Sequence, residues 1–239
     1  NIGYIYLRTC PAGCMEFLPG EEWKPYETEF SNTFEKAILE LMDTDGIIFD
    51  IRTNDGGRPE PLYKGLAHLV DSDEDIQPFQ AVKRDTTNPD RTELQVVEDY
   101  PWTPFKADEP QISYNKPIIV MTGPDCISAC DMLVALMSRY DEFTIIGKQP
   151  NGSATQVTGS RSYSISEEYE NDYILTYLTN FTFTFSDEPD KYLMRRTDFL
   201  DVPVWFTKED LINQVDTVRE YAKKLINEAN NNDETTDDA

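Results

Sequence analysis

The stretch that decides the fold is residues 116–131, KPIIVMTGPDCISACD. Residues 117–121 form a short apolar run rich in β-branched side chains, which is typical of a strand buried on both faces. Gly123 and Pro124 follow as a turn signal. Beyond the turn, apolar residues recur at helical spacing, at Ala129, Met132, Leu133, Leu136 and Met137. The stretch therefore predicts a strand, a turn and a helix.

Ser128 falls near the start of that predicted helix. Unpaired N–H groups and the helix dipole favour negative charge there, so a hydroxyl can serve as an acyl-transfer nucleophile. The N–H of Ala129 would then donate to the oxyanion. The simpler interpretation is that Ser128 only caps the helix, as serine often does. On this stretch alone, the cap is favoured.

A second strand-and-turn unit lies upstream. Residues 46–57, GIIFDIRTNDGG, combine a buried strand with a turn that ends in Gly56 and Gly57. Glycines at the carboxyl end of a strand let the backbone approach a ligand closely. Because helical segments separate the strands, we expect a parallel sheet with its ligand site at the carboxyl ends of the strands.

Composition limits the function. The 239 residues carry a formal net charge of −24, which opposes binding to nucleic acids or anionic membranes, because both would repel the chain. No apolar run approaches the roughly 18 residues that a membrane-spanning helix needs. The chain opens directly on the strand-like NIGYIYL, which suggests a piece of a longer, processed protein.

Four cysteines form two C-x3-C pairs, Cys10 with Cys14 and Cys126 with Cys130. Two disulfides would indicate an oxidising compartment, and we expect a secreted, periplasmic or cell-surface location. Free buried thiols are an equally good interpretation. A four-thiolate metal site fits the spacing less well.

The remaining segments complete one α/β domain over residues 1–229, with an excursion of short strands and loop at about 83–111. A helix is expected from Asn32, with Glu35 completing a capping box. The only histidine, His68, suits an ordinary helix surface. Residues 161–185 alternate as antiparallel strands do, and a last helix is expected from near Thr207. The acidic residues 230–239 are expected to be a disordered tail.

Several of these motifs, in this order, resemble the S41 peptidases, the C-terminal processing and tricorn-like serine proteases. The segment 46–57 resembles the family's G-L-I-x-D-L-R-x-N-x-G-G, and residues 128–131, SACD, resemble its S-A-S-E. Residues 143–148, FTIIGK, resemble the strand A-x-V-I-G-E that follows. Later, 200–204 and Asp216 are similar to P-D-x-x-V and G-x-D. The resemblance implies a crotonase-like α/β fold, a spiral of ββα units with a mainly parallel core sheet and antiparallel additions.

By this resemblance Ser128 is the nucleophile, and the oxyanion hole combines the N–H of Ala129 with one from Gly56 and Gly57. Two such backbone donors each contribute on the order of 3 kcal/mol to lowering the barrier. No cofactor or metal is required. The sequence departs from the family at the base, because members of the Ser–Lys type carry a lysine where this chain has Ser153. Lys148, close to that position, belongs to a strand end.

The tricorn-like branch instead uses an upstream histidine and a downstream acid. The histidine would lie before Asn1, in an upstream domain of the same protein. Asp187 and Glu188 lie in a plausible region for the acid, although solvated turn residues explain them better. We therefore predict a serine endopeptidase core that acts on polypeptides. The alternative is an inactive S41-like module that binds peptides or a hydrophobic ligand, for which the aromatic-rich residues 163–185 could line a pocket.

Overall fold

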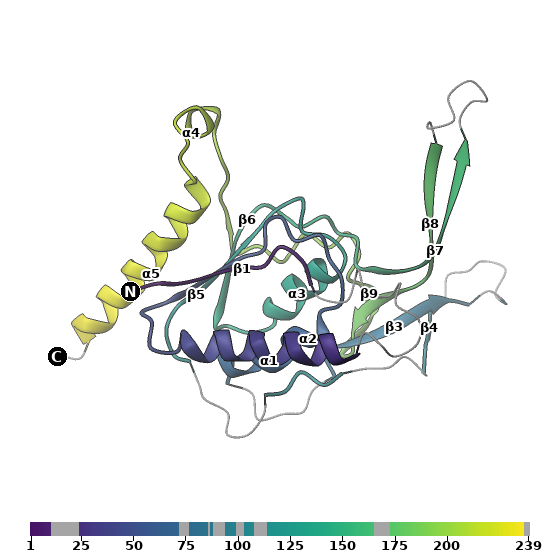
Figure 1. The fold of residues 1–239 in the computed structure, drawn as a ribbon, viewed down its shortest axis with the longest axis horizontal. Helices are drawn as coiled ribbons and strands as arrows, with labels where there is room; N and C mark the ends of the chain where they lie inside the picture. Colours follow the sequence, from purple (N-terminus) through teal and green to yellow (C-terminus); the bar gives the residue numbers. More distant parts are fainter. Residues whose placement is uncertain are drawn as a thin grey trace.

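The structure is a computed structural model. It describes residues 1–10, 24–71, 77–85, 87, 94–98, 103–107, 114–164 and 173–236, with the side chains of 156–181 and 233–236 left out. Cys14, which the sequence pairs with Cys10, lies outside the described residues. The fold is mixed α/β, with one parallel and one antiparallel sheet (Figure 1).

The parallel sheet has the strand order β1-β2-β5-β6-β10. Its strands are β1 (Gly3–Tyr6), β2 (Ile47–Asp50), β5 (Ile118–Thr122), β6 (Phe143–Gly147) and β10 (Val202–Pro203). Every neighbouring pair is parallel, and Ile47, Ile118 and Phe143 are in register. Every residue of β2 and β5 is buried, including the polar Asp50 and Thr122 that end their apolar runs.

Alternate residues of these strands enter two separate apolar cores. Ile47, Phe49 and Val120 face the larger core, whereas Ile48 and Ile119 face the smaller one. This division follows from the two-residue period of a strand, whose successive side chains point to opposite faces of the sheet. Both faces therefore have to be covered by other elements.

Helices cover both faces, and Figure 1 shows α5 (Thr217–Thr236) on the side opposite α1 (Lys24–Glu40) and α3 (Ala129–Met137). The larger core also contains residues of α2 (Glu60–Leu66) and the short 3-10 helix η2 (Ala67–Leu69). The smaller core is closed by Val218, Ala222 and Ile226 of α5. No helix among the described residues is long and apolar enough to cross a membrane.

The antiparallel sheet has the order β4-β3-β8-β7, with β9 paired to β8. Its strands are β3 (Phe79–Arg84), β4 (Leu94–Val96), β7 (Thr155–Ser164), β8 (Tyr173–Phe185) and β9 (Glu188–Tyr192). β7 and β8 form the antiparallel pair expected over 161–185, and they extend away from the rest of the molecule (Figure 1). In the excursion expected at about 83–111, Phe105 is buried against Tyr63 and Tyr140.

One predicted helix start was wrong, and another predicted helix, whose start near Thr207 is confirmed, is divided in two. The first helix begins at Lys24, so Asn32 and Glu35 lie inside it and form no capping box. The expected last helix is two helices, α4 (Lys208–Ile212) and α5. Gln214 between them has a left-handed φ of 55°, which no helix interior permits. As a result Leu211 and Val215 are 65% and 42% exposed.

The expected tail also begins inside a helix. α5 continues to Thr236, and the Asn230 side chain donates to the Asp45 carbonyl over 2.8 Å. Once α5 is docked through Val218, Ala222 and Ile226, each further residue adds a backbone hydrogen bond at little extra cost, so the helix continues into the polar sequence.

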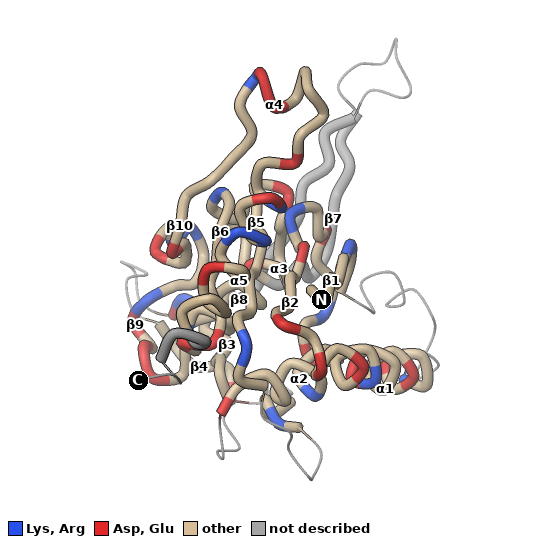
Figure 2. Tube along the Cα trace, turned by 90° about the vertical axis from the view of Figure 1, so that its left-hand side faces the viewer, with Lys and Arg blue, Asp and Glu red and all other residues tan. Residues whose placement is uncertain are grey.

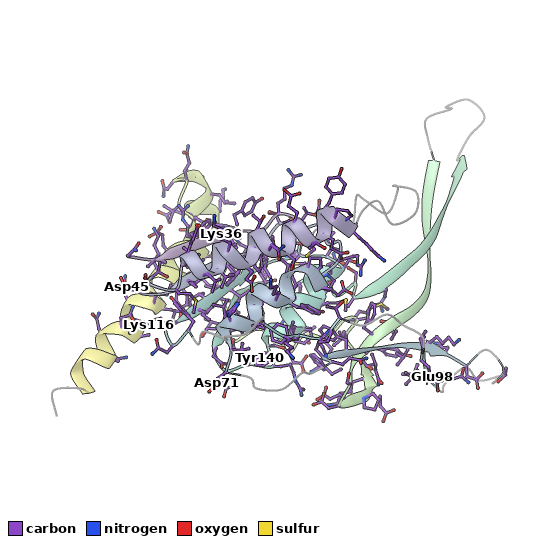
Figure 3. The ribbon with its side chains drawn as sticks, turned by 60° about the horizontal axis from the view of Figure 1, so that its bottom comes forward. Lys36, Asp45, Asp71, Glu98, Lys116 and Tyr140 are labelled. Carbon is purple, nitrogen blue, oxygen red and sulfur yellow. A yellow bond between two sulfur atoms is a disulfide. The ribbon has the colours of Figure 1, made fainter. Side chains whose placement is uncertain are left out.

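The two ends of the parallel sheet carry different residues. Asp45 and Lys116 precede β2 and β5, and Figure 3 shows them together at the amino ends of these strands. Elsewhere acidic and basic residues are interleaved, for example along α1 and in α4 (Figure 2). The glycine turn and Ser128 follow the same two strands, so they lie at the opposite, carboxyl end.

Candidate active site

Ser128 immediately precedes α3, but its side chain does not cap this helix. Its backbone has φ 59° and ψ −112°, so it is one of the few described non-glycine residues with a positive φ. Such a conformation costs of order 1–3 kcal/mol and persists only where the surroundings enforce it. The position predicted for Ser128 is therefore confirmed, whereas the interpretation of its hydroxyl as a helix cap is wrong.

A disulfide between Cys126 and Cys130 brackets Ser128. The Cys126 N–H donates to the Gly123 carbonyl and the Cys130 N–H to the Ile127 carbonyl. The nucleophile turn, which we define as residues 123–130, is thus closed both covalently and by its own hydrogen bonds. Of the alternatives for this cysteine pair, the disulfide is the one observed.

The glycine turn lies against Ser128. Gly56 and Gly57 have φ values of 87° and 127°, which side chains rarely adopt. A Cβ atom on Gly56 would lie 2.8 Å from the Ile127 carbonyl oxygen and 3.0 Å from Ser128 Cβ. A Cβ atom on Gly57 would lie 2.0 Å from the Cys10 carbonyl oxygen. The two turns that the sequence marked separately are therefore in direct contact, and they require glycine to pack this closely.

The backbone N–H groups at this contact differ in availability. The Gly56 N–H donates to Asn54 Oδ1 over 3.0 Å, so it is already used. Among the described residues, no hydrogen bond engages the N–H of Gly57 or that of Ala129. Ala129 opens α3, where a helix leaves its first N–H groups unpaired. Of the two glycines, Gly57 is the better oxyanion donor.

Asn54 holds these pieces together, and sequence reasoning did not assign it a role. Its fully buried side chain donates to the Leu7 carbonyl over 3.0 Å and accepts from Gly56, while its own carbonyl accepts from the Ile127 N–H over 3.1 Å. Cys10 Sγ also contacts Asn54 Oδ1, at 3.6 Å, and burial raises the pKa of this free thiol to about 12. The signal was present in the motif itself, where the asparagine precedes the two glycines.

Asp131, in the first turn of α3, binds the loop after β6. Its buried carboxylate accepts from the N–H of Gly152 over 2.6 Å and from both the N–H and the hydroxyl of Ser153, over 3.0 and 3.1 Å. Burial raises the pKa of Asp131, and the hydrogen bonds only partly oppose this shift. The Ser128 N–H in turn donates to Ser153 Oγ over 3.3 Å.

Arg52 follows β2 and joins two aspartates. Its guanidinium contacts both carboxylate oxygens of Asp50 over 2.8 and 2.7 Å, and both of Asp216 over 2.8 Å. Tyr4 donates to Asp50 over 2.6 Å, and burial with this hydrogen bond raises its pKa to about 12. Asp216 also accepts from the Arg219 N–H at the start of α5. This cluster fixes α5 to the strand that leads into the glycine turn.

Other candidate residues make their described contacts elsewhere. His68 does not lie on a helix surface as expected, because it is buried, with Nε2 3.0 Å from Glu35 Oε1, and its role there is structural. Lys148 Nζ lies over the Trp205 ring, 5.2 Å from its centroid. Asp187 pairs with Arg139, and Glu188 pairs with Arg196. None of the described contacts joins these side chains to Ser128, and the described residues contain no metal-binding cluster of His, Cys, Asp and Glu.

Residues 1–188 match the sequence profile of Peptidase family S41. The chain belongs to this family. Its similarity extends to solved structures, while no match is found among curated proteins. A putative peptidase from Parabacteroides merdae superposes with a TM-score of 0.62 at 18% identity, over 94% of this chain and 61% of that one.

Two further structures show the same fold. Mature CPAF, solved in complex with lactacystin, has a TM-score of 0.60 at 16% identity, over 94% of this chain and 51% of its own. A putative S41 protease from Bacteroides fragilis has a TM-score of 0.59 at 14% identity, over 94% and 54%. The S41 chain described here thus spans little more than half the length of these similar proteins.

Proposed function

We propose that this S41 chain is the core of a serine endopeptidase that cleaves polypeptides through an acyl-enzyme on Ser128. One observation carries the proposal. A serine held at a positive φ, with a hydroxyl that does not cap its helix, lies against a glycine turn, and backbone N–H groups without described partners come from both sides. These are the parts that acyl transfer needs, namely a nucleophile that is not fully buried and preorganised donors for the oxyanion.

In the proposed reaction, Ser128 Oγ attacks the carbonyl carbon of the scissile peptide bond, and its proton passes to a general base. Negative charge develops on the carbonyl oxygen, where the N–H groups of Ala129 and Gly57 receive it. Collapse of this intermediate breaks the C–N bond, and the base returns the proton to the leaving amine. Water then hydrolyses the acyl-enzyme by the same steps.

The base is proposed to be a histidine from a part of the protein outside these 239 residues. Ser153 occupies the position of the lysine in Ser–Lys relatives, and a serine hydroxyl cannot accept a proton at neutral pH. His68 is engaged with Glu35, and Lys148 stacks on Trp205. The limited share of the similar proteins that this chain covers is consistent with such a contribution.

An extended substrate is proposed to add as a strand to the outer edge of β1. Among the strands that the structure describes, β1 pairs only with β2, and the N–H groups of Gly3 and Leu7 point toward that partner. By alternation, the backbone groups of Tyr4 and Tyr6 point outward, and their side chains are 45% and 54% exposed. Such an edge supplies backbone hydrogen bonds with little dependence on substrate sequence.

The Cys126–Cys130 disulfide supports a location outside the cytoplasm, in a secreted, periplasmic or cell-surface protein. The alternative function, an inactive module that binds peptides or a hydrophobic ligand, is favoured by the lack of a described histidine or lysine in contact with Ser128. The two functions differ in whether Ser128 reacts.

A fluorophosphonate probe of serine hydrolases tests the proposal, on this chain and on the full-length protein. We expect the full-length protein to be labelled and Ser128→Ala to lose labelling entirely. Because the Ser128 hydroxyl makes no cap hydrogen bond, this substitution should change the free energy of unfolding by less than about 0.5 kcal/mol. Labelling of the isolated chain would place the base inside it. No labelling of either protein would favour the binding module.

A further inference from the structure

The loop after β6 is bound along the whole nucleophile turn. The Asn151 N–H donates to the Cys126 carbonyl over 2.9 Å, and the Asn151 side chain donates to the Pro124 carbonyl over 3.3 Å. The next two residues, Gly152 and Ser153, donate to Asp131 beyond Ser128. The loop therefore contacts the turn on both sides of the nucleophile.

Ser153 connects the carboxylate to the nucleophile itself. Its hydroxyl donates to Asp131 Oδ2 over 3.1 Å and accepts from the Ser128 N–H over 3.3 Å. A hydroxyl has one proton to donate and two lone pairs to accept, so it can make both bonds at once. The result is a chain of hydrogen bonds that runs from Asp131 through Ser153 to the backbone of Ser128.

This chain acts on the strained torsion of Ser128. Rotation about φ turns the Cβ and the hydroxyl relative to the peptide N–H. A partner that holds the N–H therefore resists the relaxation of φ from 59° to an ordinary negative value. A strained residue at a functional site persists only where several surrounding contacts hold its backbone in place.

We propose that Ser153 and Asp131 are positioning residues that hold the backbone of Ser128 in its strained conformation and so aim its hydroxyl at the substrate. The inference rests on the proposed function, because it concerns how the same serine is oriented. The position that carries a lysine in Ser–Lys relatives thus orients the nucleophile in this chain. Asp131 does its part as a carboxylate, since it accepts three hydrogen bonds from the loop.

Alanine at position 153 tests the proposal, with Ser138→Ala as the matched control. Ser138 ends the same helix, and its hydroxyl donates to the Ala135 carbonyl over 2.8 Å, so the control also removes one hydroxyl, although it removes one hydrogen bond where S153A removes two. In the full-length protein, S153A should lower the maximal rate constant of fluorophosphonate labelling about tenfold, because small misplacements of a reacting group are costly.

Two further features distinguish positioning from a general loss of structure. The probe concentration that gives half-maximal labelling should be the same in S153A, and Ser153→Thr, which keeps the hydroxyl, should restore most of the rate. S138A should be labelled at the wild-type rate. Wild-type labelling of S153A, or an equal loss in S138A, would overturn the proposal.

Amide hydrogen exchange tests the hydrogen bond independently of catalysis. The Ser128 N–H should exchange faster in S153A than in the wild type, whereas exchange at Ser128 should be unchanged in S138A. Unchanged exchange in S153A would refute the role of Ser153. A wild-type protein that takes up no probe, with faster exchange in S153A, would instead overturn the proposed function and leave only the structural bond.

Discussion

Two buried aspartates lie at the carboxyl end of the parallel sheet, and their charges are balanced in opposite ways. The side chain of Asp50 is 5% exposed and meets the guanidinium of Arg52, which also binds Asp216. Asp131 is 2% exposed, and the partners described for it are neutral donors from Gly152, Ser153 and the backbone of Ser128. One carboxylate is compensated by a cation and the other by dipoles alone.

This difference indicates that the Arg52 cluster stabilises the fold, whereas Asp131 serves the candidate active site. In the Arg52 cluster, burial raises the pKa of Asp216, but the hydrogen bonds and charge of Arg52 prevail and lower it. At Asp131 burial prevails and the pKa is raised, so ionisation there costs folding free energy. A charge retained at such a cost next to a strained serine is typical of functional sites.

The largest expected effect comes from removing the cation. Arg52→Met should lower the free energy of unfolding by about 3–5 kcal/mol, because it leaves buried carboxylates without their partner. Urea unfolding measures the loss. The control is Asp187→Asn in the exposed pair with Arg139, which should change stability by no more than about 1 kcal/mol. A loss in R52M no greater than in the control would remove the distinction between the clusters.

A smaller effect is expected at the far end of the same cluster. Asp216→Asn should destabilise the protein by about 1–2 kcal/mol, because it weakens the contact with Arg52 and the N-terminal cap of α5. In a double-mutant cycle, D216N should lower the free energy of unfolding less in the R52M background than in the wild type. Additive losses would mean that Arg52 and Asp216 contribute independently.

The smallest expected effect concerns how stability depends on pH, which should have opposite signs for Asp131 and Asp216. A raised pKa means that folded Asp131 binds a proton more readily than the unfolded chain does. The stability of the wild type relative to Asp131→Asn should therefore fall as pH rises above the unfolded value of about 3.9 and through the folded pKa. Asp216, with its lowered pKa, should behave oppositely, and its contribution should be lost as pH falls through its folded pKa. Parallel pH profiles for D131N and D216N would contradict the comparison.

Much of this arrangement could be predicted because the decisive signals are local. The apolar runs of β2, β5 and β6, each next to a glycine or proline turn, identified the parallel strands. Ser128 and the Gly56-Gly57 turn could be paired because parallel strands end at the same edge of a sheet.

The contacts that complete the site could not be predicted, because they join residues far apart in the sequence. Asp131 and Ser153 are 22 positions apart, and Arg52 and Asp216 are 164 apart. Nothing in the local pattern around Asp131 separates a buried acceptor from an ordinary acidic residue in a first helical turn. The break between α4 and α5 was missed for a similar reason, since it depends on the pairing of Asp216 with Arg52 as well as on the turn at Gln214.

The Cys126–Cys130 disulfide also makes Ser128 part of a covalent ring, closed across a sequence separation of only 4. This ring contains no lysine or arginine, so trypsin leaves it intact. An adduct on Ser128 would therefore be carried by a single tryptic peptide. Reduction of the disulfide adds two hydrogens to this peptide and does not release a second one. Mass spectrometry of labelled protein can use this signature to distinguish an adduct on the peptide that contains Ser128 from adducts on other tryptic peptides, and fragmentation of the reduced peptide then separates Ser128 from Ser113 and Ser138.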